Sequence, residues 1–310
     1  MKTPAAPDHA MTGFPPKRIF VTGGRGRLAA LVADHFRTHD VTRFSRNPGE
    51  GFRNLAGLTA PATLADADLL LHLAWSTLPA SAEQDLDAGQ KHDLPLLEKL
   101  LQACAARPAE RRPHFIFFSS GGTVYGNAPG HPSTETDPRH PIGSYGRAKV
   151  AAEEMIEQAA ARDGLPCTIL RISNPYGYSV PSGRGQGIVP HAIRCAAEGR
   201  PLTLWGDGHA RKDFLHYTDF LSALNEVVTR RLTGVFNLSA GESHSVHEII
   251  ALVEKHTGRK ISTTTTTPAP AWDVQDSRLD NRRLRDATGW RPLVTLDEGI
   301  RRSTAGHPGH

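Results

Sequence analysis

Cysteine is scarce in this 310-residue chain, which holds only Cys104, Cys167 and Cys195. The three are widely spaced, form no CxxC pair and cannot all be bridged internally because their number is odd. We therefore expect reduced thiols in a cytoplasmic protein. The 16 histidines are scattered and include no HExxH motif, so the sequence predicts no metal site.

Long apolar runs and charge of a single sign are also missing. The best candidate for a membrane segment, residues 65–74, contains two aspartates and a histidine and falls short of the ~20 apolar residues that a spanning helix needs. The net charge is +4, but basic residues are interleaved with acidic ones, even in the basic stretch 278–285 with its Asp280. We therefore expect neither a membrane nor a nucleic-acid partner.

Short β-rich runs alternate with helical patterns over most of the chain after a proline-containing leader, residues 1–17. This alternation, with strands apolar on both faces, predicts an α/β fold with a doubly wound parallel sheet (Rossmann) over residues 18–173. Residues 174–310 are predicted to form mainly a smaller α+β substrate domain, with about 211–240 returning to the sheet. The expected strands are Arg18–Thr22, Val41–Phe44, Asp68–Ala74, Phe115–Ser119, Cys167–Ile172 and Val235–Leu238, and the expected helices are Leu28–Arg37, Leu94–Ala106 and Ser144–Ala161.

The segment VTGGRGRLA follows the first expected strand and opens the first helix. Gly23 and Gly26 allow a tight turn and a close approach of the backbone to a pyrophosphate, and the helix N-terminus supplies amide donors. The second strand ends in FSRNP, where an acidic residue usually binds the ribose 2′-hydroxyl. Ser45 and Arg46 stand there instead, and an arginine suits a 2′-phosphate, so NADP is favoured over NAD. A solvated surface arginine is the alternative.

Tyr145 and Lys149 lie four residues apart in YGRAK, on one face of an expected helix. An ammonium in that position favours ionisation of the phenol and its use as a general acid or base. Upstream, the buried strand 115–119 runs into the hydroxyls of Ser119, Ser120 and Thr123, at the sheet edge where ligands of such folds bind. Local turn chemistry is the other explanation for these hydroxyls.

Six ordered segments resemble the extended short-chain dehydrogenases/reductases, most closely the NAD-dependent epimerase/dehydratase group that acts on nucleotide sugars. The resemblance covers the chain from Arg18 to about Arg302. The segments are VTGGRGRLA (21–29), HLAW (72–75), SSGGTVYG (119–126), YGRAK (145–149), RISNPYG (171–177) and WGDGHARKDF (205–214).

The resemblance implies a role for individual residues. Tyr145 would be the acid/base, Lys149 would hold the nicotinamide ribose, and Thr123 or Ser120 would assist them. The residues implied to bind the cofactor are Gly23, Arg25, Gly26, Arg27, Leu28, Ser45, Arg46, Asn54, Leu55, Leu73, Ala74, Trp75 and Ser119. Those implied to bind the nucleotide sugar are Asn174, Gln186, Val189, Leu204, Trp205, Lys212 and Asp273. The family's usual pairing also implies a homodimer, for which the Leu94–Leu101 stripe with Val150, Met155 and Ile156 offers apolar faces.

Four positions depart from the family's pattern. Gly121 stands where the family usually has a catalytic Ser or Thr. Lys212 and Pro270 each stand where the family has an arginine, and Asp93 stands where it has an asparagine. The dehydratases carry an Asp–Glu pair where this chain has Gly122 and Thr123, which argues against dehydration. We therefore expect an NAD(P)-dependent nucleotide-sugar epimerase acting at carbon 4. The alternatives are an NADPH-dependent 4-keto-sugar reductase and a catalytically inactive cofactor-sensing protein.

Overall fold

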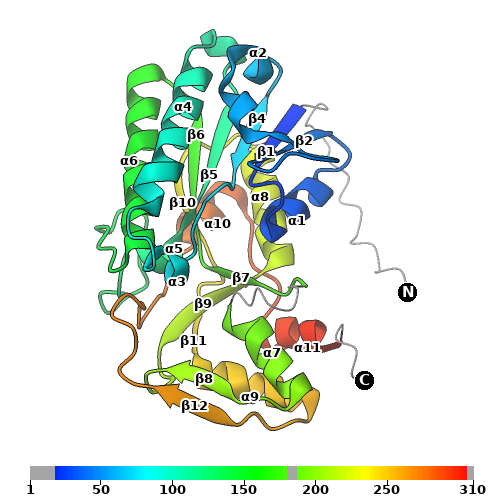
Figure 1. Ribbon diagram of the computed structural model, residues 1–310, viewed down its shortest axis with the longest axis vertical. Helices are drawn as coiled ribbons and strands as arrows, with labels where there is room; N and C mark the ends of the chain where they lie inside the picture. The colour runs from blue at the N-terminus through cyan, green and yellow to red at the C-terminus, as the bar shows by residue number, and fades with distance from the viewer. Residues whose placement is uncertain (1–17, 180–186, 306–310) are drawn as a thin grey trace.

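A seven-stranded parallel sheet forms the centre of the molecule (Figure 1). The computed structural model describes residues 18–179 and 187–305. The strand order is β10-β6-β5-β4-β1-β2-β3, and every neighbouring pair is parallel. The predicted doubly wound sheet is therefore confirmed. Its strands are β1 (Arg18–Thr22), β2 (Asp40–Ser45), β3 (Arg53–Asn54), β4 (Leu69–His72), β5 (His114–Ser120), β6 (Cys167–Ile172) and β10 (Gly234–Leu238).

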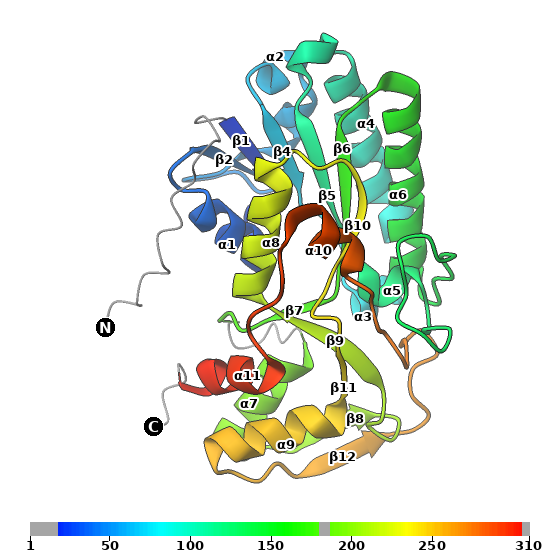
Figure 2. The ribbon, with the colours of Figure 1, turned by 180° about the vertical axis from the view of Figure 1, so that it is seen from behind.

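Helices cover both faces of this sheet, as Figures 1 and 2 show. Alternate strand residues face opposite sides, so Phe20 and Leu70 pack with α4 and α6, while Ile19 and Leu71 pack with α1 and α8. Burial on both faces explains the nearly continuous apolar strands of the sequence. The covering helices are α4 (Leu94–Ala105) and α6 (Ser144–Asp163) on one face, and α1 (Arg27–His35), α8 (Tyr217–Thr229) and α10 (Arg282–Thr288) on the other.

The apolar stripe expected at a dimer interface faces the sheet instead. Leu97 and Ile156 are fully buried, and Leu94 and Leu101 belong to the same core. A helix beside a sheet buries its most apolar stripe against that sheet, so these leucines and Ile156 are not available to a partner. Val150 and Met155 are only partly buried.

A second, smaller unit lies beyond the carboxyl ends of the main strands, at the bottom of Figure 1. It has its own core between α7, α9 and α11. Residues 211–240 divide between the two parts, because β9 joins the small sheet β11-β9-β7 whereas β10 joins the main sheet. Its elements are β7 (Asn174–Tyr176), α7 (Ile188–Glu198), β8 (Leu202–Trp205), β9 (Arg211–His216), β11 (Ser243–Ser245), α9 (Val246–Thr257), β12 (Thr263–Thr266) and α11 (Leu296–Ala305).

Short helical turns connect the main strands. Of these, α5 directly follows β5 and reaches the boundary with the smaller unit (Figure 1). In the described ranges no helix has the length and apolar character needed to cross a bilayer. The turns are η1 (Leu55–Thr59), α2 (Pro61–Leu64), α3 (Pro79–Ala82), the π-helical η2 (Gly89–Asp93), η3 (Ala109–Arg111) and α5 (Gly121–Val124).

Candidate active site

The glycine loop between β1 and α1 brings backbone against backbone. Gly23 has a φ of +70°, and a Cβ there would lie 2.9 Å from the amide nitrogen of Ala74. The amide of Gly26 donates to the carbonyl oxygen of Gly23 at 2.7 Å, and α1 begins at the next residue. The unpaired amides of the first turn of α1 therefore lie at this loop, an arrangement that fits a dinucleotide pyrophosphate.

A buried histidine joins the ends of β1 and β4. The Oγ1 of Thr22 accepts a hydrogen bond from the amide of Ala74 at 3.0 Å and lies 2.9 Å from Nδ1 of His72. Burial, together with the charge of Lys149, lowers the pKa of His72 to about 3, so the imidazole is neutral and its Nδ1 shares one hydrogen bond with the Thr22 hydroxyl. This pair holds the segment from Leu73 to Trp75 next to the glycine loop.

Positive side chains gather at the end of β2. The guanidinium carbons of Arg25 and Arg43 each lie 4.5 Å from the ring centre of Phe52. Arg25 also donates to the carbonyl oxygen of Asn47 at 2.9 Å, and Arg46, the first residue after β2, is exposed. Residues 41–49 contain no acidic side chain, so this region is suited to an added phosphate rather than to a free ribose hydroxyl.

Other residues implied to bind the cofactor have local partners. The Oγ of Ser45 accepts from the amide of Asn47 at 3.2 Å, and Oδ1 of Asn54 caps η1 by accepting from Ala56. The side chain of Leu55 is buried in the main core, while Arg27 donates to the carbonyl oxygen of Ser179 at 2.6 Å. Their roles toward a dinucleotide stay predictions.

Tyr145 and Lys149 lie at the start of α6, and a carboxylate from the loop after α3 anchors that helix end. The Oε1 of Glu83 accepts from the amide and the hydroxyl of Ser144, at 2.7 and 2.6 Å. Lys149 donates to the carbonyl oxygen of Phe118 at 3.0 Å, and its Nζ lies 5.7 Å from the ring centre of Tyr145. Lys149 therefore lies at the carboxyl end of β5, with Tyr145 one helical turn before it on α6.

Burial dominates the protonation of this pair. It lowers the pKa of Lys149 to about 7, against the opposing influence of Asp93 and Glu153. It also raises the pKa of the Tyr145 phenol, and the nearby charge of Asp93 acts in the same direction. The expected lowering of the phenol pKa by the ammonium is therefore outweighed by burial. A neutral phenol is suited to donating a hydrogen bond to a substrate oxygen.

The turn after β5 presents two free-standing hydroxyls. Ser120 and Thr123 are half-buried, and Thr123 donates to the carbonyl oxygen of Ser120 only at 3.5 Å, which is a weak hydrogen bond. A side chain at Gly121 would overlap that of Leu279 and approach the carbonyl oxygen of Arg171 to 3.0 Å. A Ser or Thr at position 121 would therefore require the Leu279 side chain to move.

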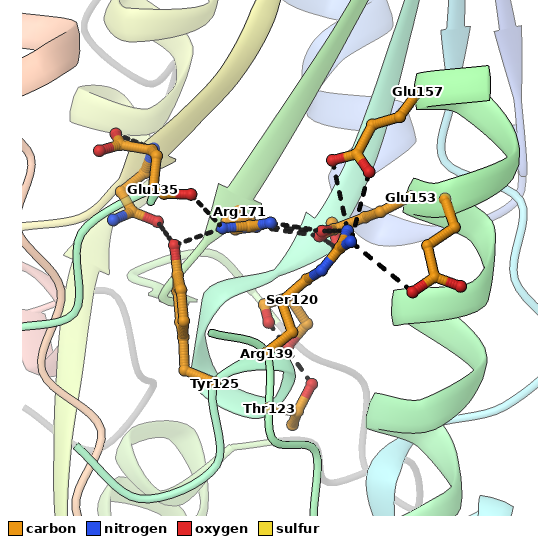
Figure 3. A network of polar contacts seen from close by, with 11 residues as sticks. Ser120, Thr123, Tyr125, Glu135, Arg139, Glu153, Glu157 and Arg171 are labelled. Carbon is orange, nitrogen blue, oxygen red and sulfur yellow. Dashed lines mark hydrogen bonds and ion pairs between the residues drawn. The ribbon is translucent and has the colours of Figure 1, made fainter. Parts of the chain in front are cut away.

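Figure 3 shows a buried ionic network behind this turn. Glu153 accepts from the hydroxyl of Ser119 at 2.5 Å and from Arg171 at 2.7 Å. Arg171 also donates to the Tyr125 hydroxyl at 2.7 Å, and Arg139 pairs with Glu153 at 3.1 Å. Removing one partner of a buried ion pair typically costs about 3–5 kcal/mol. The network fixes α6 on the sheet and engages Ser119, which the sequence had suggested for the cofactor.

Of the residues implied to bind substrate, some contact other polar groups, one is exposed and two are buried in the small core. Lys212 and Asp273 form an ion pair of 2.9 Å, and Asn174 donates to the carbonyl oxygen of Asp213 at 2.8 Å. Trp205 is 43% exposed and packs edge-on against Trp272. The side chains of Val189 and Leu204 are buried in the small core, and Gln186 falls outside the described residues.

Sequence reasoning missed the anchoring carboxylates Glu83 and Glu153. No sequence signal marks Glu83. Glu153 could have been found from its spacing, because it lies one helical turn after Lys149 on the same expected helix face. Asp93 was noted only as a departure, yet it accepts from the amide and hydroxyl of Ser76 at 2.8 and 2.6 Å. No group of three or more His, Cys, Asp or Glu side chains able to hold a metal occurs in the part of the chain that is described.

The chain is similar to known proteins over most of its length. A family model described as the NAD dependent epimerase/dehydratase family matches residues 19–239. The UDP-glucose 4-epimerase of Azospirillum brasilense is 31% identical over 321 residues, covering 92% of this chain and 90% of that protein. The dTDP-4-dehydro-6-deoxyglucose reductase of Escherichia coli is 28% identical over 232 residues, covering 74% of this chain and 72% of that protein.

The fold is also that of a solved structure. The UDP-glucose 4-epimerase of Thermus thermophilus in complex with NAD superposes with a TM-score of 0.82, covering 93% of this chain and 98% of that one, at 24% identity. This likeness extends over both the main sheet and the smaller unit.

Proposed function

We propose, from the premise that this chain belongs to the NAD-dependent epimerase/dehydratase family of enzymes, that it is a nucleotide-sugar epimerase acting at carbon 4. The observation that supports this most directly is the placement of Lys149, with Tyr145 beside it, at the carboxyl end of β5, the same edge of the parallel sheet at which β1 runs into the glycine loop. The curated relative of A. brasilense, which matches nearly the whole chain, is a UDP-glucose 4-epimerase.

Tyr145 and Lys149 have different roles in a transient oxidation of the sugar. A bound nicotinamide supplies a hydride acceptor that can return the hydride to the opposite face of the sugar. Tyr145, as the phenolate, would take the proton of the substrate hydroxyl when the C–H bond breaks, and the resulting phenol would give it back after the sugar has turned over. Lys149 holds the ribose next to this phenol, and its positive charge stabilises the phenolate when that forms.

A reductase is the second candidate, and the arginines at the end of β2 favour it. NADPH is consumed once per reduction, and Arg25, Arg43 and Arg46 offer positive charge to its 2′-phosphate. In a reductase, Tyr145 would donate its proton to the keto oxygen while hydride arrives from the cofactor. The relative of E. coli with this chemistry covers less of the chain.

Turnover of a panel of UDP- and dTDP-sugars tests both candidates. We expect a 4-epimer to accumulate without net oxidation or reduction of the cofactor. Chromatography measures the sugars, and nicotinamide absorbance measures the redox state of the cofactor. Stoichiometric oxidation of NADPH with a 4-keto sugar would instead indicate a reductase. Cofactor binding with no turnover of any sugar would contradict both and indicate a sensing role.

Tyr145→Phe removes the proton carrier and keeps the ring. We expect turnover to fall about 100-fold or more, with the cofactor dissociation constant unchanged in a binding titration. Turnover close to that of the unmodified enzyme would show that Tyr145 is not the acid/base.

A further inference from the structure

The ammonium of Lys149 lies against an aromatic side chain that the proposed chemistry does not use. Its Nζ is 3.7 Å from the ring centre of Trp75 and 4.6 Å from that of Phe117. Lys149 is only 3% exposed, and its one hydrogen-bond acceptor within the described residues is the carbonyl oxygen of Phe118. Attraction between a cation and a π face is strongest for tryptophan and for desolvated cations.

The backbone on either side of Trp75 is fixed by hydrogen bonds. Before it, the amide of Ala74 donates to Thr22 at 3.0 Å. After it, the amide and the hydroxyl of Ser76 both donate to the buried Asp93. The indole therefore extends from a short segment that cannot shift without breaking contacts to β1 and to the start of α4.

The indole ring itself is not held by its polar atom. Nε1 of Trp75 is buried and has no hydrogen-bond partner in the described part of the chain, although a buried indole N–H normally finds one. The ring packs against Phe117, with centroids 5.8 Å apart, and against Lys149. The contact that explains a tryptophan at this position is thus the one with the ammonium.

We propose that Trp75 is a positioning residue whose indole face holds the ammonium of Lys149 toward Tyr145 and the cofactor. The inference rests on the proposed function for the role of Lys149. The indole occupies one side of the ammonium and the carbonyl oxygen of Phe118 another, which leaves the remaining N–H directed away from both for the cofactor ribose. A flexible lysine without this support samples other rotamers.

A double-mutant cycle tests the proposal, with Trp75→Leu, Lys149→Met and both together. In the presence of Lys149, we expect Trp75→Leu to weaken cofactor binding and to lower turnover on the order of tenfold each. In the Lys149→Met background the same substitution should have little further effect. Trp75→Phe keeps a smaller π face and should give an intermediate loss.

An equal effect of Trp75→Leu in both backgrounds would overturn the proposal, because the indole would then act on the fold rather than on Lys149. Thermal unfolding of each variant identifies loss of folding, and if Trp75→Leu does not fold, Trp75→Phe in both backgrounds gives the same comparison. The cofactor dissociation constant needs no substrate, so this test remains valid even if the epimerase assignment fails.

Tryptophan emission gives a second readout that is independent of catalysis. We expect Lys149→Met to change the emission of the enzyme, because a charge next to the indole is lost. The change should vanish in the Trp75→Phe background, where Trp205, Trp272 and Trp290 remain. The same emission change with and without Trp75 would show that the ammonium does not contact this indole.

Discussion

At the scale of single residues, the site must orient a substrate hydroxyl without a side chain at position 121. Leu279 and the carbonyl of Arg171 fill the space that a Cβ would need there. Ser119 is engaged with Glu153, whereas among the described residues the hydroxyls of Ser120 and Thr123 make no short hydrogen bond, since Thr123 reaches only the carbonyl oxygen of Ser120, at 3.5 Å. One of these two hydroxyls is therefore the best substitute.

Thr123→Val deletes the hydroxyl and keeps the shape of the side chain. If Thr123 assists Tyr145, turnover should fall tenfold or more, on the order of 1.4 kcal/mol in the barrier, while cofactor affinity is unchanged. Steady-state kinetics and a cofactor titration measure the two effects. Ser120→Ala is the matched control, and a loss found only in that variant would transfer the role to Ser120.

At the scale of elements, the end of β2 decides which dinucleotide fits. The strand stops at Ser45, and the turn that follows returns to a bridge between Gly49 and Phe52. This turn brings the Phe52 ring against the guanidinium groups of Arg25 and Arg43, and Arg46 in the same turn is exposed. The glycine loop, with Arg25, and the end of β2, with Arg43 and Arg46, thus supply three arginines near the place where a ribose 2′-substituent is recognised in this kind of fold.

Arg46→Ala should weaken NADP(H) more than NAD(H), by about tenfold, because an arginine can form two charge-assisted hydrogen bonds with a phosphate. Isothermal titration with both dinucleotides measures the ratio. Arg53→Ala is the matched control, since Arg53 is exposed on the adjacent strand and its guanidinium lies over Phe44. An equal change for both dinucleotides would show that Arg46 only faces solvent.

At the scale of the whole molecule, we still expect a homodimer through α4 and α6, but with different contact residues. The leucine stripe packs on the sheet, so the outward positions Leu96, Val150 and Met155, all partly buried in the monomer, are left to contact a partner. A charged side chain at one of these positions would lose its hydration in the interface, which would weaken the dimer.

Sedimentation at micromolar concentration should give a dimer for the unmodified chain and a shift toward monomer for Met155→Glu. Leu293→Glu adds the same charge at a leucine that is 85% exposed and lies outside α4 and α6, and it should leave the dimer intact. A monomeric unmodified chain would refute the prediction.

The sequence by itself determined the elements and the local signals they contain. The predicted strands at 18–22 and 167–172 agree with β1 and β6 to the residue, because apolar runs and neighbouring turn residues act over short distances. The glycine loop and the spacing of Tyr145 and Lys149 are local for the same reason, since one turn or one helix face holds each of them.

Only the tertiary structure decided which side chains meet across elements. Leu279 closes position 121, Lys212 pairs with Asp273, and Trp75 lies against Lys149. Each of these contacts joins segments far apart in the chain, and their partners depend on how helices and sheets pack. Packing is also why Ser119 is engaged with Glu153 and why burial, rather than the neighbouring ammonium, sets the pKa of Tyr145.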